Sequence, residues 1–223
     1  MAMAEQAIER PGNRIRGLYV ITDEELVPGR THRLIAQAAV AGGARIVQLR
    51  DKRRSTDELT ALARELLQIT RPAGALLIVN DRVEVAAAAG ADGVHLGVGD
   101  ASPSEARALL GPGAAIGFSP ETEEQALAAR DAGTDYLGVG AIYGTGTKPD
   151  AGPPVGTARI SRLRVLTGLP IVAIGGITAE RVPEVMAAGA SAVAVISAVV
   201  AAPDPEAEAR RLCRLLERWS AAG

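Results

Sequence analysis

Two cations and an amide alternate within one short stretch of the chain, Gln48-Leu49-Arg50-Asp51-Lys52. Side chains at alternate positions of an extended chain share one face, so Gln48, Arg50 and Lys52 are expected to point the same way. Two neighbouring cations repel each other unless an anion lies between them. The stretch therefore predicts an anion-binding site. The alternative is that Arg50 and Lys52 pair with carboxylates or lie in solvent.

Two carboxylates follow the next two short apolar runs, with Asp81 directly at the end of one and Asp100 shortly after the other. Brought together without a cation, they would raise each other's pKa. Oxygen ligands from one or two carboxylates, completed by water and phosphate, suit Mg²⁺. Either aspartate alone would more often cap the helix that follows it. Beside Arg50 and Lys52, however, the pair predicts a Mg²⁺ site.

Three further segments have the composition of phosphate-binding loops, namely Thr145-Gly146-Thr147-Lys148, Gly175-Gly176 and Ile196-Ser197. Glycine lets the backbone approach an anion closely. Threonine hydroxyls and backbone amides bind phosphate oxygens, and lysine adds a point charge. The alternatives are a mobile turn with a solvated lysine, a simple turn at Gly176 and ordinary strand packing for Ile196.

Together these segments offer more anion-binding groups than one monophosphate needs. This excess implies a diphosphate near the metal and a second phosphorylated partner near Gly176 and Ser197. No Ser-His-Asp arrangement or nucleophilic cysteine accompanies them in the sequence. Electrostatic stabilisation of a departing group is therefore expected, in preference to covalent catalysis.

A repeat reveals the elements that must position these groups. An alanine-rich helical stretch, a glycine and a short apolar run recur at Gly43, Gly90, Gly133 and Gly189. Glycine just past a helix end takes the left-handed conformation without steric cost, and the apolar run after it favours a buried parallel strand. With similar runs between them, the expected strands cover 17–22, 45–49, 75–80, 93–96, 114–119, 136–139, 170–175 and 192–196. The expected helices cover 31–40, 56–70, 83–89, 103–110, 121–131, 157–166, 179–188 and 205–219.

Strict alternation of strands and helices predicts an α/β fold, a single (β/α)₈ TIM barrel, with an open doubly wound sheet as the alternative. The loops after the strands of such a barrel meet at one face, where active sites lie. We expect residues 17–223 to form the catalytic barrel and residues 1–16 an N-terminal tail that is flexible or loosely docked. Segment 143–156 is irregular and long, which is typical of a functional or mobile loop.

The composition excludes several classes of protein. The chain has 223 residues, a formal net charge of −2 and 48% hydrophobic residues, so it can bury a large core and lacks the basic bias of a nucleic-acid binder. A single cysteine, Cys213, excludes an internal disulfide. No apolar run reaches the roughly 20 residues of a membrane helix, so a cytoplasmic location is expected. Alanine-rich outer helices permit a homodimer without demanding one.

The motifs, taken in order, resemble the thiamine-phosphate synthase family over residues 17–216. The resemblance rests on Gln48-Leu49-Arg50-Asp51-Lys52, Val79-Asn80-Asp81-Arg82, Gly93-Val94-His95-Leu96-Gly97 with Asp100, Gly117-Phe118-Ser119, Thr145-Gly146-Thr147-Lys148, Ile174-Gly175-Gly176-Ile177 and Ile196-Ser197-Ala198. It implies a Mg²⁺-dependent transferase that condenses hydroxymethylpyrimidine diphosphate with a thiazole phosphate or its carboxylate. The products would be thiamine monophosphate and pyrophosphate, formed by pyrophosphate departure and capture of the pyrimidine cation.

Carried over residue by residue, the resemblance implies a role for each motif. The pyrimidine diphosphate would be bound by Gln48, Arg50, Lys52, Asn80, Ser119 and Lys148, among which Arg50, Lys52, Ser119 and Lys148 would be catalytic. Mg²⁺ would be held by Asp81 and Asp100. The thiazole phosphate would be bound by Thr145, Thr147, Gly176, Ile196 and Ser197.

The sequence also departs from the family pattern. Val98 stands where the family often has glutamine, Pro120 after Ser119 is unusual, and Ala141, Gly144 and Gly146 stand in a loop where the family usually carries prolines. Glycines loosen a loop and raise the cost of ordering it. Two other functions remain as alternatives: a barrel isomerase of the thiazole tautomerase or sugar-phosphate epimerase kind, and a non-catalytic sensor of thiamine precursors. The isomerases need neither the Gln48 to Lys52 stretch nor the aspartate pair, and a sensor need not keep a leaving-group site.

Overall fold

Short parallel strands succeed one another along the chain and close into a ring in the computed structural model, which describes residues 11–147 and 152–220. The strands are β1 Gly17–Thr22, β2 Ile46–Leu49, β3 Leu76–Asn80, β4 Gly93–Leu96, β5 Ala115–Phe118, β6 Tyr136–Val139, β7 Ile171–Ile174 and β8 Ala192–Val195. Each pairs with its neighbours in sequence, and β1 also pairs with β8, where Tyr19 lies opposite Ala194. That last pairing confirms the predicted barrel and excludes the open sheet.

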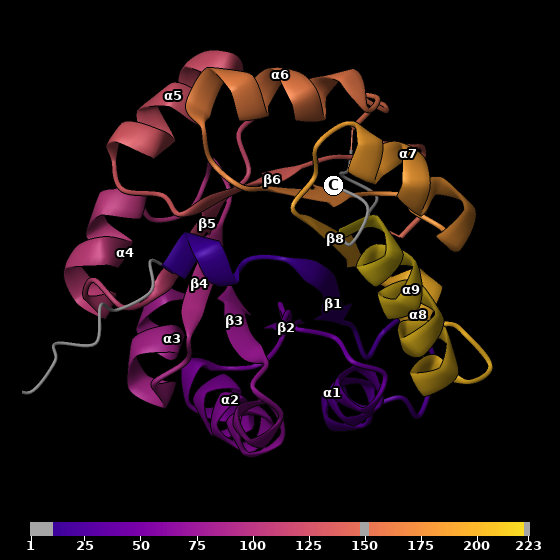
Figure 1. Cartoon of the computed structure of the whole chain (residues 1–223). Helices are drawn as coiled ribbons and strands as arrows, with labels where there is room; N and C mark the ends of the chain where they lie inside the picture. Colours follow the sequence, from indigo (N-terminus) through magenta and orange to yellow (C-terminus); the bar gives the residue numbers. More distant parts are fainter. Residues whose placement is uncertain (1–10, 148–151, 221–223) are drawn as a thin grey trace, which may run out of the picture.

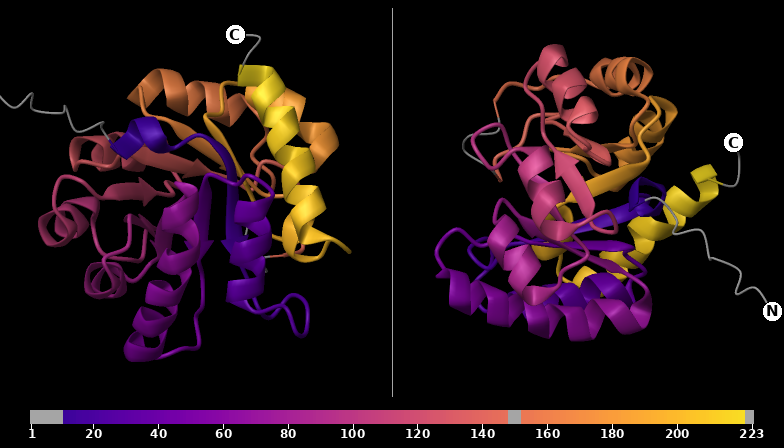
Figure 2. Two further views of the ribbon diagram at one scale, coloured as in Figure 1. Left: turned by 60° about the horizontal axis from the view of Figure 1, so that its bottom comes forward. Right: turned by 90° about the vertical axis from the view of Figure 1, so that its left-hand side faces the viewer.

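The helices form an outer ring around the strands (Figure 1). They are α1 His32–Ala41, α2 Thr56–Thr70, α3 Val83–Ala89, α4 Pro103–Leu110, α5 Glu123–Asp131, α6 Ala158–Thr167, α7 Val182–Ala187, α8 Ser197–Val200 and α9 Pro205–Ser220, with 3₁₀ turns η1 Pro11–Arg14, η2 Arg71–Ala73 and η3 Ala179–Arg181. Helix α9 packs against α1 and α7 (Figure 2). Gly42 permits this approach, because a Cβ there would lie 2.5 Å from the Cβ of Ala209.

Local sequence signals explain where several helices begin. Ser55, Ser102 and Thr122 each cap a helix, and the third helical residue returns a hydrogen bond to the backbone amide of the cap. Because Thr122 is a cap, α5 begins at Glu123, two residues later than the sequence predicts. The predicted helix 179–188 is divided into η3 and α7, and Pro183 lies in the first turn of α7, where its missing N–H is tolerated.

The short helix α8 was not expected from the sequence. Its residues Val199 and Val200 are fully buried and continue the apolar run of β8. Hydrophobic periodicity cannot separate a short buried helix from the end of a buried strand. The helix matters for the site because it begins at Ser197, shortly after the last barrel strand.

Residues just before β1 pack against the amino end of the barrel. Residues 11–14 form η1, which contacts β5, and Ile15 is only 1% exposed. A Cβ on Gly12 would lie 2.9 Å from the carbonyl oxygen of Asp135, which directly precedes β6. Residues 11–16, which the sequence assigns to the tail, therefore belong to the packed part of the barrel. The rest of the expected tail, residues 1–10, lies outside the described residues.

Aliphatic side chains fill the space between strands and helices, as expected for a chain with only 2% aromatic residues. Two buried tyrosines, Tyr19 on β1 and Tyr136 on β6, are the exceptions among the largest fully buried residues. Within the described residues, no helix is both long and apolar enough to cross a membrane.

Candidate active site at the C-terminal mouth of the barrel

A cavity of about 860 Å³ opens at the carboxyl ends of the strands, from β4 to β8. Six of the residues that line the cavity were predicted from the sequence to be site residues. They are Ser119, Thr145, Thr147, Gly176, Ile196 and Ser197. These residues follow β5, β6, β7 and β8, so the fold brings together groups far apart in the sequence.

The other described site candidates do not line this cavity. Among the described residues, the cavity wall does not include the predicted site residues on or after β2, β3 and β4, which are Gln48, Arg50, Lys52, Asn80, Asp81 and Asp100. Lys148 lies outside the described residues. The structure therefore groups the predicted thiazole phosphate residues with Ser119 in one cavity, and the wall of this cavity includes none of the other described diphosphate and metal candidates.

The backbone after β7 carries two consecutive glycines in the left-handed region, with φ of +99° at Gly175 and +63° at Gly176. A Cβ on Gly175 would lie 2.6 Å from the Cα of Ala141, and one on Gly176 would lie 2.5 Å from the carbonyl oxygen of Gly144. No larger residue fits at either position. The loop after β6 therefore packs directly on the turn after β7, and the Tyr143 amide donates to the Gly175 carbonyl across 3.0 Å.

Hydroxyl groups complete this corner of the cavity. Thr147 Oγ1 donates to Ser197 Oγ across 3.1 Å, and the Thr147 amide donates to Thr145 Oγ1 across 3.2 Å. We call Gly175, Gly176, Thr145, Thr147 and Ser197 the cradle. It combines close backbone with hydroxyls after β6, β7 and β8, in the part of a barrel where phosphate sites commonly lie.

Arg181, which sequence reasoning missed, also lines the cavity beside the cradle. Its guanidinium donates to the Gly176 carbonyl across 2.5 Å and lies 4.4 Å from the centre of the Tyr143 ring. The Tyr143 hydroxyl donates to Glu184, and burial, followed by this carboxylate, raises the pKa of Tyr143 to about 12. No sequence signal singles out Arg181, because it lies on a surface turn several residues after the glycines.

The end of β2 presents an arginine with spare hydrogen-bonding capacity. Arg50 contacts Asp23 at 3.5 Å, while its Nε is buried and has no partner among the described residues. A guanidinium carries five N–H donors, so this side chain can bind an anion without breaking a close ion pair. Lys52 is exposed, whereas Gln48 is 3% exposed and contacts Tyr19 in the barrel interior.

The two candidate metal ligands lie after adjacent strands. Asp81 follows β3 and has φ of +63°, a strained conformation for a residue other than glycine. Its amide donates to the His95 carbonyl across 2.8 Å, which ties the end of β3 to β4. Asp100 is exposed, and its Oδ2 accepts from the Gly97 amide across 2.7 Å. Neither aspartate is the N-cap of a helix, because Arg82 and Ser102 hold those positions before α3 and α4.

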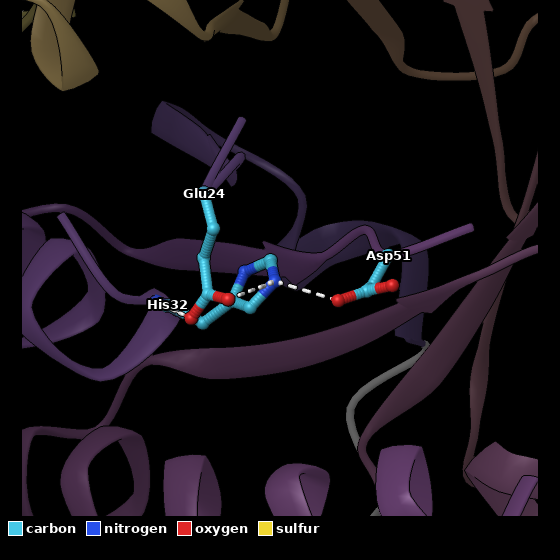
Figure 3. A group of neighbouring side chains, drawn as sticks. All are labelled: Glu24, His32 and Asp51. Atoms are coloured by element: carbon cyan, nitrogen blue, oxygen red, sulfur yellow. Dashed lines mark hydrogen bonds and ion pairs between the residues drawn. The ribbon is translucent and has the colours of Figure 1, made fainter. Parts of the chain in front are cut away.

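A different cluster of possible metal ligands lies after β1 and β2. One ligand atom from each of Glu24, His32 and Asp51 lies within 4.8 Å of the others, and both carboxylates point toward the buried imidazole (Figure 3). Arg54 contacts both Glu24 and Asp51. Because Arg54 and His32 already occupy these carboxylates, the cluster is an ion-pair and hydrogen-bond network. Sequence reasoning did not find it.

This network shifts the pKa of its acids downward. Burial alone would raise the pKa of Asp51, but hydrogen bonds from the Arg54 and Arg53 amides and from His32 outweigh it and lower the pKa to about 2. Burial likewise opposes the change at Glu24, whose pKa is lowered by the His32 amide and by Arg54. Both groups therefore remain ionised at neutral pH and hold α1 and the loop after β2 together.

A series of polar side chains crosses the barrel interior from β2 to the cavity. Gln48 Nε2 donates to Tyr19 Oη across 2.7 Å, and Tyr19 Oη lies 3.2 Å from Tyr136 Oη. Tyr136 Oη lies 3.1 Å from His95 Nδ1, and His95 Nε2 lies 2.8 Å from Ser119 Oγ. We call these five residues the interior relay. Of its members, the sequence nominated only Gln48 and Ser119 as site residues.

Comparison with known proteins points to one family. The family model described as thiamine monophosphate synthase matches residues 18–199. A thiamine-phosphate synthase of Methanospirillum hungatei is 50% identical over 200 residues, covering 90% of this chain and 97% of the relative. One from Chloroflexus aurantiacus is 49% identical over 199 residues, covering 89% and 92%.

A solved structure agrees with these relatives. The thiamine phosphate pyrophosphorylase of Pyrococcus furiosus superposes with a TM-score of 0.84 at 37% identity, covering 93% of this chain and 98% of that one. The family match spans nearly all of the barrel, including the loops that form the cavity. This chain belongs to the thiamine monophosphate synthase family.

Proposed function

We propose that the mouth of this barrel joins a pyrimidine methyl diphosphate to a thiazole phosphate, with release of pyrophosphate and formation of thiamine monophosphate. The relatives' name specifies this product. The observation that carries the assignment of the site is the cavity itself, which is lined by both Ser119 and the cradle. A cavity of this size can hold two small substrates side by side.

The diphosphate end of the first substrate belongs near β2 and β3. Arg50, Lys52, Asn80 and Lys148 would bind its oxygens, and this role is supported by the buried Nε of Arg50, which has no partner within the described part of the chain. Mg²⁺ would be held by Asp81 and Asp100, since carboxylate oxygens are its preferred donors and neither aspartate is a helix N-cap. A bound Mg²⁺ would neutralise negative charge on pyrophosphate and so make it a better leaving group.

The second substrate belongs at the cradle. Gly176 lets the loop after β6 pack directly on the turn after β7 and lines the cavity, while Thr145, Thr147 and Ser197 offer hydroxyls to a phosphate. Ile196 contributes apolar wall, and Arg181 adds a positive charge beside this position. The phosphate would then hold the thiazole ring with its nitrogen facing the pyrimidine, which would lie against Ser119.

The bond changes follow from this arrangement. The C–O bond to pyrophosphate breaks, the electron pair leaves with the oxygen, and the methylene carbon of the pyrimidine becomes cationic. The thiazole nitrogen then donates its lone pair to form the new C–N bond. Arg50 and its basic neighbours stabilise the charge that develops on the departing group. Apolar wall residues such as Val195 and Ile196 exclude water that would otherwise capture the cation.

The test is incubation of the protein with both precursors and Mg²⁺, with pyrophosphate and thiamine monophosphate measured together. Arg50→Ala is expected to lower turnover by about 10²–10³-fold, the typical cost of losing one group that stabilises developing charge. Arg53→Ala is the matched control, since its side chain is 78% exposed and pairs with Glu25.

Each alternative has its own outcome in this assay. Conversion of a thiazole phosphate without pyrophosphate release would indicate an isomerase, and binding without turnover would indicate a sensor. Equal turnover in Arg50→Ala and Arg53→Ala would refute the role given to Arg50.

A further inference from the structure

The interior relay connects the barrel centre with the cavity. Tyr19 and Tyr136 are 1% and 0% exposed, whereas Ser119 reaches the cavity wall. Gly117 and Gly138 leave room for the side chains of the interior relay. A Cβ on Gly117 would collide with His95 Nδ1, and one on Gly138 would lie 2.7 Å from Ser119 Oγ. The relay is therefore built into the strands of the barrel.

With the Gln48 amide oriented so that its nitrogen faces Tyr19, the donors and acceptors of the relay have one direction. Gln48 Nε2 can only donate, so Tyr19 Oη accepts from it, and the Tyr19 hydrogen is directed to Tyr136. Tyr136 in turn directs its hydrogen to His95 Nδ1. The opposite direction would leave the Tyr19 hydroxyl hydrogen without an acceptor among the described residues, in a place closed to water. A buried donor without an acceptor is costly.

The direction fixes the state of the last two members. His95 Nδ1 accepts from Tyr136, so the neutral ring carries its hydrogen on Nε2 and donates it to Ser119 Oγ. Ser119 then accepts from His95, and its own hydroxyl hydrogen can be donated to a ligand in the cavity. Reversal of the ring tautomer would turn that hydrogen back toward His95.

We propose that Tyr136 is a positioning residue, which holds His95 in the Nε2–H tautomer so that Ser119 donates a hydrogen bond to an acceptor atom on the heteroaromatic ring of the substrate. The proposal rests on the proposed function only for the identity of that ring. Burial raises the pKa of both Tyr19 and Tyr136, so the two phenols stay protonated at neutral pH and remain able to donate along the relay.

The first measurement is ¹⁵N NMR of the imidazole nitrogens in the protein without substrate. The chain has two histidines, so the spectrum is simple to assign. We expect Nε2 of His95 to be protonated and Nδ1 unprotonated. In Tyr136→Phe, which keeps the ring and removes the donor, we expect a mixture of tautomers. Thr70→Val is the control, because it removes a buried hydroxyl that has no partner among the described residues and lies on the outer helix α2.

The second measurement is kinetic. Tyr136→Phe is expected to lower kcat/KM for the pyrimidine diphosphate by about three- to tenfold, the value of one neutral hydrogen bond, and to leave KM for the thiazole phosphate unchanged. In a Ser119→Ala background the same change is expected to have no further effect, because the two residues act through one bond.

Three outcomes would overturn the proposal: a protonated Nδ1 on His95 in the unaltered protein, an unchanged His95 tautomer in Tyr136→Phe, or additive effects of Tyr136→Phe and Ser119→Ala. The first needs no variant, so it decides the question even if Tyr136→Phe fails to fold. The tautomer measurements need no turnover, so their failure is distinct from a failure of the proposed condensation.

Discussion

The cradle depends on the absence of side chains at Gly175 and Gly176, and Gly176 offers the clearer test. Gly176 has φ of +63° and lies so close to the loop after β6 that a Cβ would meet the Gly144 carbonyl. Any other residue at position 176 would therefore have two separate unfavourable effects. One is the strain of a left-handed backbone, and the other is displacement of the wall that would receive a phosphate.

Gly176→Ala is expected to lose both stability and affinity for the thiazole phosphate. Gly74→Ala separates the two effects, because Gly74 has a similar φ of +69° but nothing within 4 Å of its Cβ position. Gly74→Ala should therefore lose only the strain, roughly 1–2 kcal/mol of unfolding free energy. Gly176→Ala should lose more and also raise KM for the thiazole phosphate. Urea unfolding and steady-state kinetics measure the two quantities, and equal behaviour of the variants would contradict the cradle.

At the level of single residues, the sequence predicted the groups at strand ends better than those inside the barrel. Ser119 and Gly176 follow strands closely, so alternation and barrel geometry place them at the mouth. Tyr136 and His95 lie within strands, where the expectation for a large side chain is core packing. Their mutual contact joins β4 and β6, which do not pair with each other in the sheet. Only the three-dimensional register reveals such a contact.

At the level of elements, the ends of β1 and β2 are joined by charge. Glu24 follows β1, Asp51 follows β2 and His32 begins α1, and Arg54 contacts both carboxylates. Four of the strands were predictable because each apolar run follows a recognisable helix end, and the others because similar apolar runs lie between them. The ion-pair network was not predictable, because its members lie in or beside loops whose sequences show no periodic pattern.

The network gives the protein an acid-sensitive contribution to stability. The pKa of Asp51 is lowered from 3.8 to about 2, so its contribution is complete above about pH 5 and is lost as the pH falls toward 2. Because the side chain is only 11% exposed, water screens it little, and the shift corresponds to about 2 kcal/mol of unfolding free energy. Asp51→Asn is expected to be less stable at pH 6 and to lose less stability than the unaltered protein between about pH 5 and pH 2.

Urea unfolding at a series of pH values measures this difference. Asp131→Asn is the control, since Asp131 is exposed and its described ion pair is with its neighbour Arg130. Exposed pairs contribute little to stability, so this variant should follow the unaltered protein at every pH. Parallel curves for Asp51→Asn and the unaltered protein would contradict the assignment.

At the level of the whole molecule, the candidate active site lies at one end of the barrel, and the segment before β1 packs against the other end. The cavity lies at the carboxyl ends of the strands, whereas η1 and Ile15 pack at the amino ends. The sequence predicted the mouth, because the barrel fold fixes where the loops after the strands meet. It did not predict the packing of residues 11–16, because they show no periodic pattern and their burial depends on a contact with the distant segment before β6.

Separation of the two ends predicts that the amino end can be weakened without loss of catalysis. Ile15 is 1% exposed, and Ile15→Ala is expected to cost about 2–5 kcal/mol of unfolding free energy, the usual range for emptying a buried isoleucine site. The kcat and both KM values should remain unchanged at temperatures where the variant is folded. Val165→Ala, at a position 86% exposed, should change neither quantity. Because stability and turnover are measured on the same preparations, a fall in kcat without unfolding would show that the amino end of the barrel communicates with the site, and the two ends would then have to be treated as one unit.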